Sequence, residues 1–375
     1  MNKVGFSSIG LHFPSIFLSV ENLAKLRNVD PDKYTIGLGC RKISLCPENI
    51  SVVELAVEAA KRALSRWGGT LDDIGLLAVG TESAPDMSRP LSAFVAEKLG
   101  IHGAVRSYEV KHACYGGTLA IRQALEWKLA NIAPKKAALV IAADISLYKV
   151  GDPGEPTQGA GAVAFIIDTP DIAAIDSVSY PFSKPVFDFW RPENEPFPLV
   201  NGDFSLECYK KAARTCFKAL CIDKNIEFAN LFDVYKALCF HVPFPKMVKK
   251  AFADICLSSG IDPEQCEQLF LEKVNPTMEW NSLTGNSYTA SLWVSVAKTL
   301  CGLHAGDQIT AFSYGSGCGA ELLVLRAGNL AAEGKWREDV NKDLENRKEI
   351  NAETYMQMRR RDKKESHFVE SLIKG

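Results

Sequence analysis

A thiol at the start of a predicted helix is the first feature of this sequence that could do chemistry. Cys114 lies in the stretch EVKHACYGGT, after a short predicted strand at 105–110 and before a helical pattern that begins at Thr118. The dipole and the free amides of a helix N-terminus favour a thiolate and can hold an oxyanion on an acylated sulfur. Gly116 and Gly117 allow a substrate or the backbone to approach closely. Cys114 is therefore a candidate nucleophile.

The other cysteines are the background against which Cys114 is judged. The chain has 11 cysteines, scattered along its length without a C-x-x-C pair, so the sequence predicts no metal site. Each is typical of a small buried side chain. Scattered thiols without a secretory signal indicate a reducing compartment, and the predicted localisation is cytoplasmic.

Two candidate acid–base residues follow apolar runs that predict buried strands. His241 ends the run in CFHVPF, and Glu82 directly follows GLLAVG. Side chains at strand ends of α/β sheets tend to meet at one site. Partial removal from water would raise the pKa of Glu82 toward that of a useful general base. His112 is the rival base, but on a strand-to-helix turn its side chain should point away from Cys114.

Two further polar stretches lie beside predicted helices and turns. Asn286, in GNSYTAS, precedes a helical pattern and is placed to cap it. Ser316, in FSYGSGCGAE, lies in a glycine-rich turn that exposes backbone amides. Both could line a site as well as serve the local backbone.

Apolar strands alternate with amphipathic helices in both halves of the chain. This alternation is typical of α/β layers with buried parallel strands. The stretch 180–201, rich in proline, phenylalanine and charge, predicts an irregular excursion. The predicted helices are 52–65, 91–99, 118–130, 208–220, 246–258 and 288–300; the predicted strands are 75–80, 137–145, 162–167, 308–313 and 320–326, and 231–240 leads into another.

The two halves end alike, on QGAGAVAFII and GSGCGAELLVL, each a glycine-rich turn before a final apolar strand. This echo indicates an internal duplication. The remaining tail, 331–375, is strongly charged and helix-prone. It predicts a solvated surface helix or a partly disordered end.

The composition excludes several classes of partner. The net charge is -2, which gives no electrostatic case for nucleic acid or an anionic membrane. No apolar run approaches the length of a membrane span. With 375 residues, of which 47% are hydrophobic, the chain is expected to be a globular enzyme with no nucleic-acid or membrane partner.

The stretches that carry these residues also resemble a known family. In chain order they are VDPDKYTIGLG, TES, ACYGGT, GEPTQGAGAVA, DFWRP, PLVNGDFS, CFHVPFPKM, GNSYTAS and FSYGSG. Over about residues 1–330 the chain resembles the 3-hydroxy-3-methylglutaryl-CoA synthases of the thiolase superfamily, above all the bacterial enzymes of the mevalonate pathway. The resemblance implies a thiolase-like α/β fold of two related halves, 1–168 and 169–375, in five αβαβα layers. Superfamily habit implies a homodimer.

The resemblance also implies roles for single residues. Cys114 corresponds to the acylated nucleophile, Glu82 to the general base, and His241 to the histidine that assists at the acetoacetyl carbonyl. The reaction uses coenzyme A thioesters as substrates and no metal or other cofactor. The implied substrate-binding residues are Asn286, Ser316, Gly315 and Tyr148 around the acyl group, and Lys246 and Lys250 near the coenzyme A.

The implied reaction is a Claisen-type condensation of acetyl-CoA with acetoacetyl-CoA. Cys114 takes the acetyl group, and Glu82 then removes a proton from its methyl carbon. The enolate attacks the C3 carbonyl of acetoacetyl-CoA while His241 assists at the oxygen, and water releases 3-hydroxy-3-methylglutaryl-CoA. Because the reaction starts from an acetyl group, it needs a base for a carbon-bound proton, and Glu82 is a suitable residue type.

Other functions remain open from the sequence. A 3-hydroxy-3-methylglutaryl-ACP synthase of polyketide β-branching would keep the fold and take its acyl groups from an acyl carrier protein. A decarboxylating ketosynthase would use Cys114, His241 and Asn286 and would not depend on Glu82. A non-catalytic homologue and a Cys-His thioester hydrolase are the remaining alternatives. The tail is shorter than is usual in the family, and Cys318 and the pair 111–112 are not residues of the family motifs.

Overall fold

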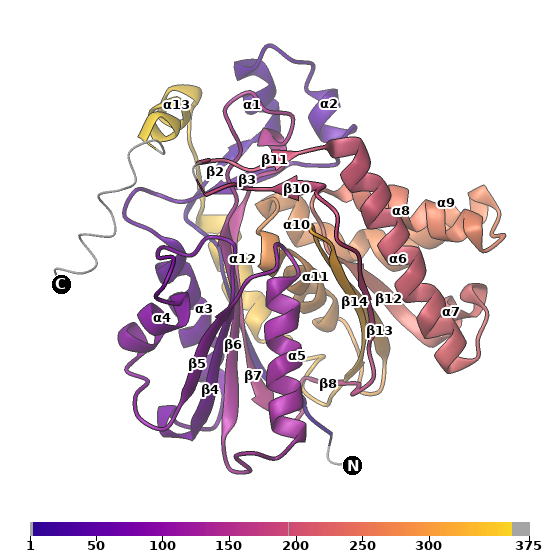
Figure 1. Ribbon diagram of the computed structural model, residues 1–375. Helices are drawn as coiled ribbons and strands as arrows, with labels where there is room; N and C mark the ends of the chain where they lie inside the picture. Colours follow the sequence, from indigo (N-terminus) through magenta and orange to yellow (C-terminus); the bar gives the residue numbers. More distant parts are fainter. Residues whose placement is uncertain (1–2, 194, 362–375) are drawn as a thin grey trace.

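The computed structural model describes residues 3–193 and 195–361 (Figure 1). Its helices are α1 (Val20–Leu26), α2 (Asp32–Thr35), α3 (Val52–Arg66), α4 (Leu91–Leu99), α5 (Gly116–Leu129), α6 (Gly202–Lys224), α7 (Leu231–Val234), α8 (Pro245–Ser258), α9 (Pro263–Leu269), α10 (Glu279–Thr284), α11 (Ser291–Leu300), α12 (Trp336–Asn346) and α13 (Ala352–Arg361). Its strands are β1 (Gly5–His12), β2 (Ile16–Ser19), β3 (Lys42–Leu45), β4 (Ile74–Gly80), β5 (Arg106–Val110), β6 (Ala137–Ile145), β7 (Ala160–Asp168), β8 (Ala173–Ile175), β9 (Tyr180–Ser183), β10 (Phe189–Trp190), β11 (Leu199–Val200), β12 (Tyr235–Phe240), β13 (Gln308–Gly315), β14 (Gly319–Ala327) and β15 (Lys348–Glu349). Each predicted helix and strand is present; the helix 91–99 and the strand 137–145 have the predicted bounds, and the others have shifted ends.

A large mixed sheet runs through the molecule in the order β12-β13-β14-β8-β1-β7-β6-β4-β5, with β9 also beside β14. The strands that lead to the candidate residues are parallel, because β4 pairs in parallel with β5 and β6, and β12 pairs in parallel with β13. β7 and β14 are antiparallel to β6 and β13. The prediction of parallel strands is therefore correct only in part. The connections from β6 to β7 and from β13 to β14 contain no α-helix that would carry the chain back to the starting end of the sheet, so these pairs are antiparallel.

Apolar side chains form three clusters that lie between layers of helices and strands. Figure 1 shows the arrangement of these helices and strands. α3 and α4 pack on one face of β4, β6 and β7. α5 and α11 lie in a second cluster with strands from both halves, and α6 and α8 pack with β12, β13 and β14 in a third. The β4–β6–β7 end of the large sheet and its β12–β13–β14 end therefore form two separate layers. The order of layers is helix, sheet, helix, sheet, helix. This confirms the predicted thiolase-like α/β fold.

The two halves place their chemistry at matching strand ends. Glu82 follows β4, and His241 follows β12, which are the strands that pair in parallel with β6 and β13. The two glycine-rich turns both lead into antiparallel strands, β7 and β14, next to these pairs. We propose on this basis that the halves divide as 1–168 and 169–375.

The described part of the tail forms the helices α12 and α13, as predicted, but both are packed against the body of the protein through buried side chains. Trp336 on α12 is buried, and its indole N–H donates to the Ala297 carbonyl at 3.0 Å. Tyr355 on α13 is also buried. Aromatic side chains thus anchor both helices although charged residues are frequent in them. The end of the predicted tail, 362–375, lies outside the described residues.

The excursion 180–201 is irregular as predicted, but it contains short strands. β9 extends the main sheet beside β14, and β10 pairs with β11 as a hairpin. Of the helices in the described part of the chain, none is both long and apolar enough to cross a membrane.

Candidate active site

Cys114 lies on a tight turn between β5 and α5, directly before the helix, as predicted. Ala113 takes a φ of 43°, a left-handed conformation that a residue with a side chain rarely adopts and that is common at functional sites. The amides of Tyr115 and Gly116 donate to the carbonyls of the turn itself, at 3.0 and 3.1 Å. These two amides are therefore engaged and do not supply the predicted oxyanion contacts.

Glu82 is the direct partner of the nucleophile, since the Cys114 thiol donates to Glu82 Oε1 over 3.1 Å. The two residues follow β4 and β5, neighbouring parallel strands whose carboxyl ends meet at one edge. Burial, and then the negative charge of Asp144, raises the pKa of the Glu82 carboxyl. Glu82 is thus a carboxylate with enhanced basicity in contact with a thiol.

The Cys114 thiol is not a ready thiolate, and this corrects the expectation from its place at a helix N-terminus. Burial, and then the charge of Glu82, raises the pKa of Cys114 well above its ordinary value. Nearby carboxylates outweigh the helix dipole, whose effect falls off within one turn. Deprotonation of Cys114 therefore needs an adjacent acceptor, and Glu82 occupies that position.

Asp144, at the end of β6, is a buried carboxylate that the sequence analysis missed. Its Oδ1 accepts from Thr81 Oγ1 (3.0 Å), the Glu82 amide (2.7 Å) and Ser83 Oγ (2.8 Å). Its Oδ2 accepts from the amide (3.0 Å) and the hydroxyl (2.5 Å) of Thr289. Burial raises the pKa of Asp144, but these five donors counteract the rise, so we assign the proton of the pair to Glu82.

Asp144 also joins the two halves of the molecule. Thr289 belongs to the 3-10 helix Tyr288–Ala290 that precedes α11, while Glu82 belongs to the first half. Within the sequence, Asp144 is one acidic residue in the apolar run AALVIAADI. An ionisable residue at the end of a buried strand was the available signal, as it was for Glu82.

His241 follows β12 and is 2% exposed. Its amide donates to the Phe312 carbonyl (2.7 Å), and its carbonyl accepts from the Tyr209 hydroxyl (2.6 Å). Burial lowers the pKa of His241 to about 3, so the ring is neutral at neutral pH. Within the described residues its buried Nδ1 has no hydrogen-bond partner.

Cys114 and Glu82 are thus in contact, whereas no hydrogen bond joins the His241 ring to either of them within the described part of the chain. This separation leaves the imidazole for a group other than the thiol. The rival base His112 lies with its ring against Tyr115, at a centroid distance of 5.4 Å. Its ring also lies against Gly319, where an added Cβ would come within 2.5 Å of it.

Tyr148 is buried beside the Cys114 and Glu82 pair. Burial raises its pKa, and the charges of Cys114 and Glu82 add to this effect, which places the phenol within their electrostatic reach. Its ring makes an edge contact with Phe189 of β10 at 6.4 Å, and Phe189 makes another with Tyr288 at 6.1 Å. The aromatic wall is consistent with a role in binding an acyl group.

The turn between β13 and β14 packs directly against the Cys114 turn. A Cβ at Gly315 would lie 2.4 Å from the His112 carbonyl oxygen, so only glycine fits this position. Ser316 is half-buried next to it. The Gly317 amide is engaged, because it donates to Asp188 Oδ1 at 3.1 Å. The structure therefore brings Gly315 and Ser316 to the nucleophile.

Asn286 lies one residue before the N-cap Ser287 and forms a turn there, so the predicted helix cap is not at Asn286 itself. Its side-chain oxygen accepts from the Tyr288 amide at 2.9 Å, at the start of the helical segment that leads into α11. Its own amide donates to the Thr157 carbonyl at 2.9 Å. Asn286 is buried and holds the 146–159 loop against the second half.

Lys246 and Lys250 lie four residues apart on α8 and therefore share one face of the helix. Lys246 is half-buried and its amide donates to the Leu38 carbonyl at 2.9 Å, whereas Lys250 is exposed. The intervening Lys249 binds Glu267. The two outer lysines lie on the helix that begins four residues after His241.

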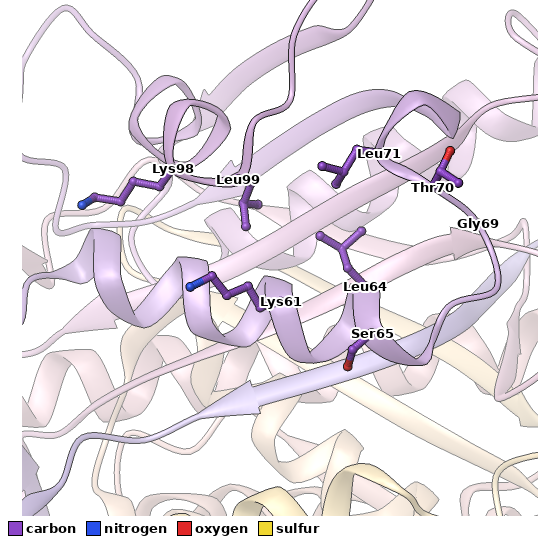
Figure 2. A pocket seen from close by; sticks show the side chains of 8 residues that line it. All are labelled: Lys61, Leu64, Ser65, Gly69, Thr70, Leu71, Lys98 and Leu99. Carbon is purple, nitrogen blue, oxygen red and sulfur yellow. The ribbon is translucent and has the colours of Figure 1, made fainter.

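A surface hollow of about 420 Å³ lies elsewhere, between α3, α4 and the 69–71 loop (Figure 2). Its two lysines, Lys61 and Lys98, bind Glu58 and Glu54. It contains no candidate catalytic residue. Among the described residues there is also no group of three or more His, Cys, Asp or Glu side chains that could hold a metal ion.

Comparisons with known proteins place the whole chain in one family. The model of the hydroxymethylglutaryl-coenzyme A synthase N-terminal region matches residues 1–172, and the C-terminal model matches 173–265 and 259–372. The hydroxymethylglutaryl-CoA synthase of Enterococcus faecalis is 34% identical over 365 residues, which cover 95% of this chain and 91% of that protein.

Two solved structures are similar throughout. MvaS in complex with 3-hydroxy-3-methylglutaryl coenzyme A has a TM-score of 0.87 at 33% identity and covers 95% of this chain and 91% of its own. The HMG synthase of the curacin biosynthetic pathway, in complex with its acetyl donor-ACP, has a TM-score of 0.90 at 28% identity and covers 96% and 89%.

Proposed function

Because this chain belongs to the hydroxymethylglutaryl-CoA synthase family, we propose that Cys114, Glu82 and His241 carry out the condensation that defines the family. The chain is an acyl-transferring enzyme that condenses acetyl-CoA with acetoacetyl-CoA, a step of the mevalonate pathway. The observation that supports the residue assignment best is the 3.1 Å contact between the Cys114 thiol and Glu82 Oε1.

The proposed first stage acetylates Cys114. Glu82 takes the thiol proton, the sulfur attacks the thioester carbon of acetyl-CoA, and the coenzyme A thiol leaves with a proton. Glu82 is then an ionised base beside the new acetyl thioester once that proton has been passed on. Its raised pKa makes it a stronger base than an exposed carboxylate.

The second stage forms the carbon–carbon bond. Glu82 removes a proton from the acetyl methyl group, and the resulting enolate carbon attacks C3 of acetoacetyl-CoA. The neutral His241 ring donates a hydrogen bond to the oxygen that develops negative charge there. That oxygen then takes up the proton that Glu82 removed, which gives the tertiary hydroxyl and returns Glu82 to the carboxylate. Water then cleaves the bond to Cys114 and releases the product, whose other end retains coenzyme A. Each of these steps moves protons and acyl groups between protein and substrates, so we propose that no cofactor takes part.

Replacement of His241 by alanine should slow condensation by ~10²–10³-fold, which is the usual effect of losing one oxyanion donor. Acetylation of Cys114 should remain within about tenfold of wild type, because no hydrogen bond links the ring to that thiol. Single-turnover acetylation and steady-state synthesis measure the two steps separately. His304→Ala, an exposed histidine, is the control. Equal loss of both steps would contradict the assignment.

The rate of condensation should rise with pH across the raised pKa of Glu82, because the base acts only when ionised. The acid limb should therefore lie above the range of an ordinary exposed carboxylate. His241, with its pKa lowered to about 3, should add no further limb near neutral pH. A pH profile of single-turnover condensation from preformed acetyl-enzyme tests this, and a flat profile between about pH 5 and pH 8 would contradict it.

We propose that free coenzyme A, rather than an acyl carrier protein, brings the acetoacetyl group. Lys246 and Lys250 support this, since ammonium groups on one helical face suit phosphate oxygens. The test compares acetoacetyl-CoA with the same acyl group on a carrier protein as the substrate of the acetylated enzyme. We expect acetoacetyl-CoA to be at least about tenfold better by kcat/KM, a difference of about 1.4 kcal/mol. Preference for the carrier would instead support the polyketide β-branching function.

We also propose a homodimer formed along β5. In the described part of the chain β5 pairs on one side only, with β4, and its residues Arg106 and Ser107 are exposed. A hollow of about 410 Å³, lined by Leu76, Tyr108 and Trp127 among others, lies beside it. An unpaired edge strand with apolar neighbours is suited to pairing with a second copy.

All 11 cysteines have free thiols, which supports a cytoplasmic location.

A further inference from the structure

We propose that Arg359, on α13, is a positioning residue for Tyr148, and that α13 clamps the loop that carries this tyrosine beside the nucleophile. The proposal rests on the proposed function, because it assigns Tyr148 to the acyl pocket of that reaction. It gives the charged C-terminal segment a task in catalysis.

The first contact of the clamp is with the backbone of Tyr148. Arg359 donates from Nη2 to the Tyr148 carbonyl and from Nη1 to Gln158 Oε1, the latter at 3.3 Å. Gln158 Oε1 also accepts from the Tyr148 amide at 3.1 Å. Gln158 thus holds the amide of Tyr148 and Arg359 holds its carbonyl, and Arg359 also binds Gln158. Arg359 is 4% exposed and Gln158 is fully buried.

The second contact is made by Tyr355, one helical turn earlier on α13. Its hydroxyl donates to Glu155 Oε1 at 2.8 Å and accepts from Gln158 Nε2 at 2.9 Å. Glu155 is held in turn by two guanidinium donors of Arg27, at 2.6 and 2.7 Å. Tyr355 and Glu155 are buried, so these charge-assisted bonds lie out of competition with water.

The loop between β6 and β7 is shaped by its own backbone hydrogen bonds and the 3-10 helix Glu155–Thr157, and buried side chains tie it to the rest of the molecule. Its sequence, VGDPGEPTQG, is rich in glycine and proline, and Gly151 takes a φ of 81°. At its far end the Thr157 carbonyl accepts from the Asn286 amide. Gln158 and Arg359 add side-chain contacts at Tyr148 to these backbone bonds, and the Glu155 side chain accepts from the Gly151 amide at 2.9 Å.

Arg359 also contacts the excursion that covers the site. Its guanidinium lies over the Phe197 ring, 5.4 Å from the centroid. The same excursion places Phe189 against Tyr148, and Arg191 donates to the Glu82 carbonyl at 2.7 Å. One buried side chain from α13 therefore touches both segments that border the catalytic pair. Loss of Arg359 should loosen Tyr148 without removing any group that touches the reacting atoms.

The test compares Arg359→Ala with Arg360→Ala, which removes the same charge from the next, exposed position. A small misplacement of a positioning group reduces turnover more than binding, so we expect kcat to fall about tenfold and KM to stay within about twofold in Arg359→Ala. Hydrogen exchange of the peptide spanning 148–158 should be faster in that variant. Arg360→Ala should match wild type in both measurements, and Arg359→Lys should recover part of kcat.

The two readouts separate failure of this proposal from failure of the proposed function. Hydrogen exchange needs no substrate, so unchanged exchange in Arg359→Ala overturns the clamp whatever the reaction is. Faster exchange with unchanged kcat overturns its link to catalysis. If wild type makes no product, the proposed function fails and exchange alone decides whether α13 clamps the loop. If Arg359→Ala does not fold, Tyr355→Phe, which removes one hydroxyl, carries both measurements with the same expected directions.

Discussion

Glu82→Ala should lose condensation by ~10²–10⁴-fold, the usual contribution of a general base, while Cys114 is still acetylated. Within the described residues Glu82 is the carboxylate that contacts the thiol, so its loss removes the acceptor of the carbon-bound proton of the acetyl group. Acetylation should persist because the charge of Glu82 raises the pKa of the Cys114 thiol, and its removal makes that thiol more acidic. In acetylation, the greater acidity of the thiol partly offsets the loss of its proton acceptor. In condensation, nothing offsets the loss of the base.

The measurement follows acetyl transfer to the protein and product formation in the same sample. Asp86→Ala is the matched control, since Asp86 lies in the same loop and binds only the amides of that loop. It should retain both steps. A Glu82→Ala enzyme that still condenses at the wild-type rate would remove Glu82 from the mechanism. Use of a malonyl thioester by that variant would favour a decarboxylating ketosynthase, which needs no such base.

Cys114→Ala should lower the rate of synthesis by at least ~10⁴-fold, as expected when the nucleophile is removed from a set of catalytic residues that act together. No acetyl group should be transferred to the protein, because within the described residues no other cysteine thiol has a hydrogen bond to a carboxylate. Cys46→Ala, which removes another thiol whose pKa burial raises, is the control and should behave as wild type. Synthesis that survives in Cys114→Ala would mean direct attack of an acetyl-CoA enolate, without an acyl-enzyme.

The fold and much of the site follow from local patterns. Strand and helix periodicity, the glycine after α4 and the glycines after Cys114 are local signals, and they place Glu82 and His241 at strand ends. The order of nine short stretches supplied the resemblance. Both sources work because strand ends and nucleophile turns are marked by residues that lie next to one another in the chain.

The remaining features depend on residues far apart in the sequence. The helix dipole at Cys114 was visible, but the carboxylate of Asp144, which adds to the raised pKa of Glu82, comes from another strand. Antiparallel β7 and β14 follow from the absence of crossover helices, not from their apolar composition. In the tail, the burial of single side chains such as Trp336 and Arg359 could not be predicted. They lie in a charged stretch of sequence, and their hydrogen-bond partners are far away in the chain.

The central claim is that an acetyl group passes through Cys114 to become part of 3-hydroxy-3-methylglutaryl-CoA. The most direct measurement is mass spectrometry of wild-type protein and small molecules after mixing with isotopically labelled acetyl-CoA, before and after acetoacetyl-CoA is added. We predict label on the peptide that contains Cys114 first, and its transfer into 3-hydroxy-3-methylglutaryl-CoA on addition of the second substrate. Label that never reaches Cys114, or that leaves it only as free acetate, would contradict the account.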